Sequence, residues 1–168
     1  VFYRSLEDVV AKDIFVPKYY DQKSLSGIHE LVSKYSDLEL ISLGDLVGKG
    51  ELTIFNGHGS PSSDQRLGVV PYIKVSDLRA GHVDINPTNM VPLELDNEFW
   101  GGDISGMKPY DLISPERASK NIGEFCVLMP GQEQAVFTKE VIVIRTLNEN
   151  LFDQFYLLWA LSLKEVRN

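Results

Sequence analysis

The sequence has a single cysteine, three histidines and no long hydrophobic segment. One cysteine excludes an internal disulfide and a cysteine-rich zinc site, and it suits a reducing, cytoplasmic environment. Cys126 lies in a strand-like run, which favours a buried, inert thiol over a nucleophile. No apolar run approaches the roughly 20 residues that span a bilayer, so we expect no membrane segment. Because the chain starts at Val1 without a signal-peptide pattern, we expect a fragment of a longer protein.

Basic residues are also scarce. The chain has 16 Lys and Arg against 24 Asp and Glu, for a net charge of -8. This balance argues against a free-standing nucleic-acid binder that depends on its overall charge. The charge is uneven, because no base occurs between Arg79 and Lys108, while that stretch holds five acidic residues. Much of the acidic excess therefore fits on one non-binding face.

Catalytic signatures are missing as well. Residues 57–59, Gly-His-Gly, lack the remainder of a phosphate-binding loop, and residues 86–89 lack the second proline and the aromatic of an amino-methyltransferase loop. The only acid-x-Lys triplet, residues 21–23, has no partner acid for a metal-dependent nuclease site. Three histidines alone establish no Ser/His/Asp arrangement. We expect no enzyme, no catalytic residue and no metal site in this chain.

The composition is that of one globular domain, with 43% hydrophobic residues and short periodic segments. Helical spacing predicts helices before Pro17, from Leu25 to Tyr35, over residues 42–47, and over residues 151–167 with Asn148 as the cap. Strands are predicted at residues 38–41, 52–55, 69–75, 90–95 and 109–113, followed by a β-meander of residues 125–129, 135–138 and 141–145. The fold class is α+β, a twisted, mainly antiparallel sheet with flanking helices and a C-terminal helix. We divide it into a connector (residues 1–20), a recognition domain (21–147) and a C-terminal helix (148–168) that packs on the domain or a partner.

Residues 68–83 organise the middle of the chain. Pro71 places the strand of residues 69–75 at an edge or near its own start, because proline lacks the amide donor. Ser76 or Asp77 then caps a helical turn at residues 78–79, and Gly81 lets the chain reverse. Lys74 and Arg79 follow this strand and suit phosphate positioning.

Two polar loops, residues 56–66 and 114–123, lie next to strands and contain basic residues. Arg and Lys donate to phosphates and guanine edges, and Asn and Gln pair with adenine. Solvated loops without a binding role are an equally open alternative on composition alone. The candidate DNA-binding residues are Asn56, His58, Ser60, Gln65, Arg66, Lys74, Arg79, Lys108, Arg117, Lys120 and Asn121.

Residues 68–78, Gly-Val-Val-Pro-Tyr-Ile-Lys-Val-Ser-Asp-Leu, followed by Gly-His-Val at 81–83, resemble a hallmark of the target recognition domains of type I restriction-modification specificity subunits. The chain is also similar to the carboxyl-terminal recognition region fused to adenine methyltransferases. Residues 110–114, 122–127 and 141–145 resemble the distal strands of these domains in the same order. Residues 17–21 and 43–46 are similar to the lead-in of the methyltransferase-fused type.

The resemblance implies a specificity module that reads part of a duplex DNA target within a prokaryotic, cytoplasmic restriction-modification or adenine-methylation complex. The implied partners are double-stranded DNA, a DNA methyltransferase subunit or domain, and a restriction subunit. The methyltransferase would bind S-adenosylmethionine, and this chain would bind no cofactor. The alternative function is an acidic protein-interaction module that docks a methyltransferase without reading DNA.

Overall fold

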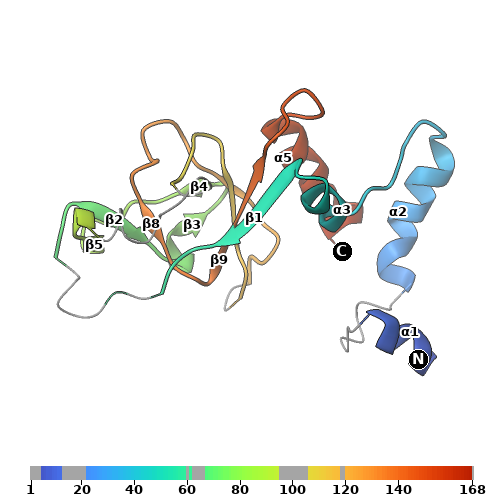
Figure 1. Ribbon diagram of the computed structural model, residues 1–168, viewed down its shortest axis with the longest axis horizontal. Helices are drawn as coiled ribbons and strands as arrows, with labels where there is room; N and C mark the ends of the chain where they lie inside the picture. Colours follow the sequence, from blue (N-terminus) through green and yellow to red (C-terminus); the bar gives the residue numbers. More distant parts are fainter. Residues whose placement is uncertain are drawn as a thin grey trace. The chain divides into compact units, whose positions relative to one another are not determined.

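The computed structural model describes residues 5–12, 22–59, 61, 67–94, 106–117 and 120–167. These residues belong to two compact units (Figure 1). The helical unit comprises Val1–Ile41 with Leu163–Asn168, and the sheet unit is Ser42–Ser162. The boundaries between the units are thus residues 41 and 162, whereas the sequence suggested divisions after residues 20 and 147.

The helical unit contains α1 (Leu6–Lys12), α2 (Gln22–Lys34) and the short α6 (Lys164–Arg167). The helices predicted before Pro17 and from Leu25 are therefore present. α2 contacts α6 closely, since a Cβ added at Gly27 would lie 3.1 Å from the Cγ atom of Glu165. Residues 17–21, which resemble a lead-in, lie outside the described residues. The helix that follows them is α2.

The strand predicted at residues 38–41 is wrong. These residues have no regular structure, and the side chains of Leu38 and Leu40 are 46% and 61% exposed. Alternating apolar residues form a strand only where a neighbouring strand accepts their backbone hydrogen bonds. Within the described part of the chain, no strand pairs with this segment.

The described part of the sheet unit contains two sheets. The larger has the strand order β1-β9-β6-β7-β4-β3 and the smaller β5-β2-β8. Among the described residues, five of the seven strand pairings are antiparallel, which confirms the α+β class with mainly antiparallel strands. The strands are β1 (Leu52–Asn56), β2 (Val70–Ile73), β3 (Leu78–Arg79), β4 (His82–Val83), β5 (Met90–Val91), β6 (Leu112–Pro115), β7 (Cys126–Val127), β8 (Val136–Phe137) and β9 (Val141–Thr146).

The predicted β-meander of the last three strands is wrong. β7 pairs with β6 and β4, β8 pairs with β2 in the smaller sheet, and β9 lies between β1 and β6. Short turns indicate where strands begin and end, but the partners are chosen by packing between residues far apart in the chain. β5 and β6 also differ in extent: β5 covers only Met90–Val91, and β6 begins at Leu112 because Tyr110 takes a left-handed turn conformation, with φ 70°.

Residues 68–83 form β2, the 3-10 turn η3 (Val75–Asp77) and the β3–β4 hairpin. The helical turn comes earlier than predicted, because the Lys74 N–H donates to Asp77 Oδ2 at 2.8 Å and places Asp77 inside the turn. Leu78 is instead paired with Val83. Ala80 and Gly81 have φ values of 50° and 85°, as the two-residue hairpin turn requires. Pro71 is the second residue of the central strand of the smaller sheet, so its position near the strand start is the correct alternative.

β6 and β9 are buried on both faces and divide the core in two. Ile113 and Val143 pack with the smaller sheet, whereas the neighbouring Leu112 and Ile144 pack with the helices α3 (Leu43–Gly48) and α5 (Gln154–Ser162). Each fully buried side chain of this size contributes about 1.5–3 kcal/mol. These two strands are therefore the rigid centre from which the loops project.

The C-terminal helix differs from its prediction in extent. It begins at Gln154 and not at Leu151, because Asp153 Oδ1 accepts the Tyr156 N–H at 2.7 Å and caps it. α5 ends at Ser162, whose hydroxyl donates to the Leu158 carbonyl at 2.7 Å, and α6 is a separate helix. Leu157 packs α5 onto the sheet unit.

Candidate nucleic-acid interface

Three chain segments come together where β2 and β8 end. The Ile73 carbonyl accepts the Thr138 N–H at 3.0 Å, so Lys74 and Thr138 follow parallel neighbouring strands. On the other side of β8, the His58 N–H donates to the Phe137 carbonyl at 2.6 Å, and the His58 carbonyl accepts the Lys139 N–H at 2.7 Å. This backbone pairing thus brings basic and polar residues from distant parts of the sequence next to one another.

We call this region the sheet-end cluster, and its members are Asn56, His58, Lys74, Glu116, Arg117 and Lys139. Gly57 is required for its assembly, because a Cβ at this position would collide with the carbonyl oxygens of Phe137 and Thr138. The absence of a side chain lets the chain after β1 approach the β8 backbone.

Glu116 connects two candidate reader residues. Its Oε2 atom accepts the Asn56 amide at 3.1 Å and the Arg117 guanidinium at 2.7 Å. The hydrogen bond and the charge of Glu116 raise the pKa of Arg117, which stays cationic. The Glu116 N–H donates to the Glu140 carbonyl at 2.8 Å, which fixes the end of β6 beside the turn that carries Lys139. Asn56 also lies within 3.4 Å of the Val141 carbonyl.

His58 and Lys74 flank the end of β8 on its two sides. Burial lowers the pKa of His58 below its usual 6.5, so this side chain is less readily protonated than a free histidine. Lys74 is exposed, and its Nζ donates to Asn89 Oδ1 at 2.9 Å. A cavity of about 60 Å³ next to Lys74 is lined by Tyr72, Thr88 and Asn89 among others.

The remaining candidates lie at several places. Arg79 is exposed on the β3–β4 hairpin and donates to the Ser76 carbonyl at 2.9 Å. Lys120 and Asn121 belong to the turn after β6, and this turn is attached to the strand by the Gly123 N–H, which donates to Ser114 Oγ at 3.2 Å. Ser60, Gln65 and Arg66 lie outside the described residues.

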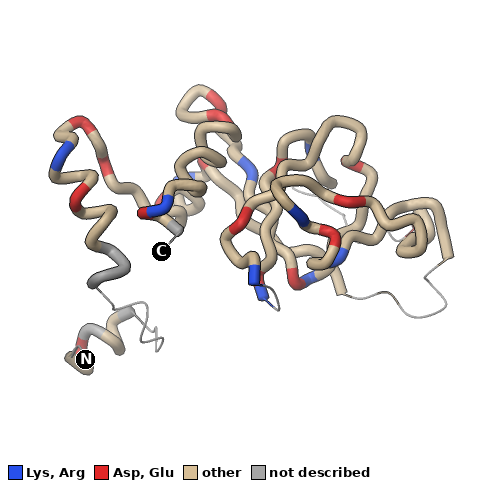
Figure 2. Tube along the Cα trace, turned by 180° about the vertical axis from the view of Figure 1, so that it is seen from behind, with Lys and Arg blue, Asp and Glu red and all other residues tan. Residues whose placement is uncertain are grey.

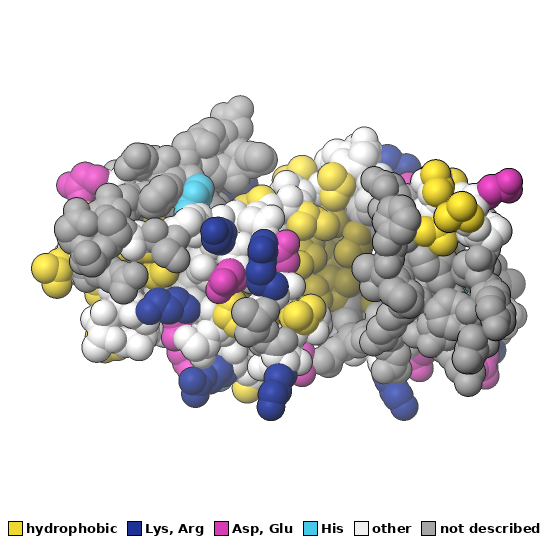
Figure 3. Space-filling view, turned by 90° about the horizontal axis from the view of Figure 1, so that it is seen from below, with side chains coloured by type: hydrophobic (Ala, Val, Ile, Leu, Met, Phe, Trp, Pro, Cys, Tyr) yellow, Lys and Arg dark blue, Asp and Glu magenta, His cyan; other side chains and the backbone are white. Residues whose placement is uncertain are grey.

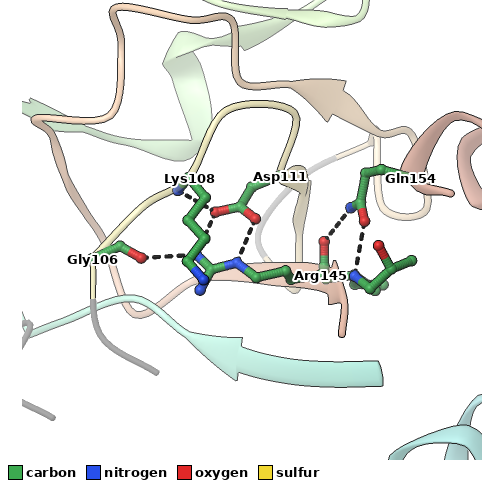
Figure 4. Close-up of polar contacts among 7 residues, drawn as sticks. Gly106, Lys108, Asp111, Arg145 and Gln154 are labelled. Carbon is green, nitrogen blue, oxygen red and sulfur yellow. Dashed lines mark hydrogen bonds and ion pairs between the residues drawn. The ribbon is translucent and has the colours of Figure 1, made fainter. Parts of the chain in front are cut away.

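Lys108 is at the opposite end of β6 from Arg117, so the two do not share one cluster. It borders a polar cavity of about 430 Å³ together with Tyr110, Arg145, Thr146 and Gln154. Figure 4 shows that the Arg145 guanidinium here points toward Asp111 and the Gly106 carbonyl. Gln154 accepts the Thr146 N–H and donates to the Ile144 carbonyl, which ties α5 to β9.

Sequence reasoning missed Lys139, Glu116 and Arg145. The sequence does contain a signal for Lys139 as a binding residue, since it is a basic residue in the short turn between two predicted strands. Glu116 has no such signal, because an ionised carboxylate cannot donate hydrogen bonds to DNA. Arg145 ends a run of aliphatic strand residues, and this pattern alone does not distinguish it from an exposed strand residue. In the structure its side chain is only 6% exposed.

The charges of the sheet unit are mixed. Along the chain trace in Figure 2, basic and acidic positions alternate over its loops. In the face seen in Figure 3, Lys and Arg side chains lie interspersed with acidic ones, beside a hydrophobic area. On this face the cations therefore do not form one continuous patch.

Among the described residues, no group of three His, Cys, Asp or Glu side chains has the arrangement of a metal site. No helix of the described part is long and apolar enough to cross a membrane. Cys126 is buried, as expected, and burial raises the pKa of its thiol.

No protein-family model and no curated protein matches the chain. Solved structures do match. The HsdS subunit from Thermoanaerobacter tengcongensis aligns with a TM-score of 0.51 and 16% identity, over 89% of this chain and 35% of that chain. A chain from a study of complex assembly and conformational transition of the type I R-M system aligns with a TM-score of 0.49 and 16% identity, over 93% of this chain and 37% of that chain.

The chain thus spans about a third of the length of these matched chains. The alignment with the T. tengcongensis HsdS subunit shows that this chain has the fold of part of such a subunit. At the level of the fold, it confirms the resemblance to specificity subunits expected from residues 68–83.

Proposed function

We propose that this chain reads part of a duplex DNA target as the specificity module of a restriction-modification or adenine-methylation complex. The supporting observation is the sheet-end cluster, in which segments from β1, β2, β6 and the β8–β9 turn bring Lys74, Arg117 and Lys139 onto one end of the sheets. The likeness of the fold to an HsdS subunit agrees with this proposal.

The cluster offers two kinds of donor. Lys74 and Lys139 are exposed ammonium groups and suit phosphate oxygens, which fix a protein on the duplex without reading its sequence. The Asn56 amide and the Arg117 guanidinium have the geometry that pairs with adenine and guanine edges. Base reading in this proposal belongs to these two residues and to the loop that follows His58.

The scarcity of cations sets the expected strength. Each phosphate contact contributes about 0.9 to the slope of log K against log salt, so the two lysines, Lys74 and Lys139, predict a slope near -2. Affinity of the isolated chain is therefore low. A methyltransferase subunit or domain that binds S-adenosylmethionine, with a restriction subunit in the full assembly, supplies the remaining contacts in the prokaryotic cytoplasm.

A binding titration tests this function. Fluorescence anisotropy with random-sequence duplexes, from low to moderate salt, is expected to give weak binding with that shallow slope. Lys49→Ala is the matched control, since Lys49 follows α3 at the opposite end of β1 from Asn56 and should leave binding unchanged. Absence of binding by the folded protein at every salt concentration contradicts the proposal.

A second candidate is a module that docks a methyltransferase without reading DNA. It is favoured by α5, where Phe155, Tyr156 and Trp159 are 51%, 55% and 57% exposed although the opposite face of the helix packs on the core. Exposed aromatic side chains of this kind are common at protein interfaces. Stable association with a methyltransferase, combined with no detectable DNA binding by the complex or by the chain, would favour this candidate.

A further inference from the structure

One oxygen atom of Glu116 accepts hydrogen bonds from two residues of the sheet-end cluster. Its Oε2 lies 3.1 Å from Asn56 Nδ2, 3.2 Å from Arg117 Nε and 2.7 Å from Arg117 Nη2. An anionic oxygen that receives a guanidinium edge and an amide is in the environment that a DNA acceptor oxygen would have.

We propose that Glu116 is a competing acceptor: it occupies the Asn56 and Arg117 donors in the free protein and is displaced from them by an acceptor oxygen of duplex DNA. The inference rests on the proposed function and assigns a specificity-determining role to an acidic residue of the same site. Glu116 acts through Arg117 and Asn56, so it is a positioning residue.

The contact is easily exchanged. The side chains of Arg117 and Glu116 are 60% and 37% exposed, and ion pairs at such positions are weak because water screens them. Asn56 keeps its place without the carboxylate, because its Nδ2 also lies 3.5 Å from the Lys139 carbonyl and 3.4 Å from that of Val141. The Asn56 amide therefore remains positioned when Glu116 leaves it, and the exposed Arg117 guanidinium becomes available to another acceptor.

The carboxylate itself stays close after displacement. The Glu116 N–H is bonded to the Glu140 carbonyl, and the preceding Pro115 is paired with Val141, so the backbone at this point is fixed. A bound duplex consequently meets a nearby negative charge, and only a duplex that supplies an acceptor for both donors gains hydrogen bonds that offset this repulsion. Glu116 should thus weaken general phosphate binding more than binding to a well-fitting target.

The first test compares three charge-removing variants in the full chain. Glu116→Gln keeps the size and an oxygen acceptor but loses the charge. Glu140→Gln is the matched control, because it removes a charge from the neighbouring residue, whose carboxylate also raises the pKa of Arg117. Glu149→Gln, in the turn after β9, controls for net charge. Circular dichroism and thermal melting verify that all three fold like the wild type.

Binding to random duplexes at low salt should become about two- to fivefold tighter in Glu116→Gln, the range in which an exposed ion pair contributes. Its salt slope should steepen by roughly 0.9, as one further phosphate contact predicts. Both controls should stay within about twofold of the wild type, with its slope. If Glu116→Gln and Glu140→Gln have equal effects while the wild type binds DNA, the inference about Glu116 is wrong and the proposed function stands. No binding by the wild type would overturn the proposed function together with it.

A second background shows whether Glu116 acts through Arg117. In Arg117→Ala, the added Glu116→Gln change should improve binding no more than Glu140→Gln does. A full gain in that background contradicts the competition. The acceptor oxygen that displaces Glu116 can belong to a backbone phosphate or to the edge of a base. Sequencing of the duplexes that Glu116→Gln binds from a random library distinguishes these two sources. A gain across all sequences identifies phosphate, and a gain restricted to duplexes that share a guanine identifies the base edge.

Discussion

Asp111 and Arg145 form a bidentate ion pair inside the sheet unit. Arg145 Nε lies 2.7 Å from Asp111 Oδ1, and Nη2 lies 2.6 Å from Oδ2, with side chains that are 6% and 1% exposed. Asp111 Oδ2 also accepts the Lys108 N–H at 2.8 Å, and Arg145 Nη2 donates to the Gly106 carbonyl at 2.7 Å. The pair therefore joins the turn before β6 to the neighbouring strand β9.

Asp111→Asn should be strongly destabilising. The change leaves the Arg145 guanidinium buried without its counter-charge, and removing one partner of a buried pair costs about 3–5 kcal/mol. Urea unfolding followed by circular dichroism measures the effect. Asp84→Asn removes the same charge from a side chain that is 50% exposed beside His82, and it should change stability by about 0.5 kcal/mol or less. Similar stabilities of the two variants would contradict this account of the pair.

Gly57→Ala tests the close approach of the chain after β1 to β8. The new Cβ would collide with the Phe137 and Thr138 carbonyl oxygens, so the backbone must shift, at a cost of roughly 1–3 kcal/mol. Gly59→Ala is the control, because a Cβ there has no atom within 4 Å. Thermal melting should show a lower Tm for Gly57→Ala only. An unchanged Tm would mean that His58 does not sit beside Thr138 as described.

The local elements were predictable from the sequence, and the partners of the strands were not. The helix of residues 22–34 and the strand of residues 70–73 follow from periodicity and β-branched content, which are local properties. The pairing of β8 with β2 is a contact between residues more than 60 apart, and no turn signal specifies it. The strand expected at residues 38–41 failed for the same reason, since it has the pattern of a strand without a partner.

In the candidate site too, the residue types were predictable from the sequence and their positions relative to one another were not. Asn56 and Arg117 were selected by residue type in polar loops, and the structure brings them together through Glu116. Lys108 was selected by the same criterion, yet it lies at the other end of β6. The place of Lys139 beside His58 depends on the parallel pairing of residues 58 and 138, so it required the tertiary structure.

Cys126 should be unreactive in the folded protein. Burial raises the pKa of its thiol, and the thiolate is the reactive form, so modification must wait for opening of the structure. We expect labelling by a thiol reagent at pH 8 to be much slower in buffer than in denaturing urea. The free amino acid cysteine in the same two solvents controls for the effect of urea on the reagent. Equal labelling of native and unfolded protein would show that the β7 region is open.

His58 should make stability depend on pH. Burial lowers its pKa in the folded state, whereas the unfolded chain has the ordinary value of 6.5. Between the lowered pKa and 6.5 the unfolded chain binds more protons, so stability falls as the pH falls through this window and is fully present above it. His58→Gln should remove this part of the dependence. Urea unfolding of both proteins from pH 5 to 7.5 should give curves that diverge, and parallel curves would contradict the burial of His58.

Lys139 offers a test of the interface at a residue outside the candidates chosen from the sequence. Its N–H is bonded to the His58 carbonyl at 2.7 Å, and its side chain is exposed, so Lys139→Ala removes a cation while leaving the backbone pairing intact. If the ammonium contacts a phosphate, affinity for all duplexes should fall to a similar extent, and the salt slope should become shallower by about 0.9. Lys49→Ala makes the same change in net charge at the other end of β1 and should not alter the slope. A slope in Lys139→Ala equal to that of the Lys49→Ala control would place the phosphate contacts elsewhere on the chain.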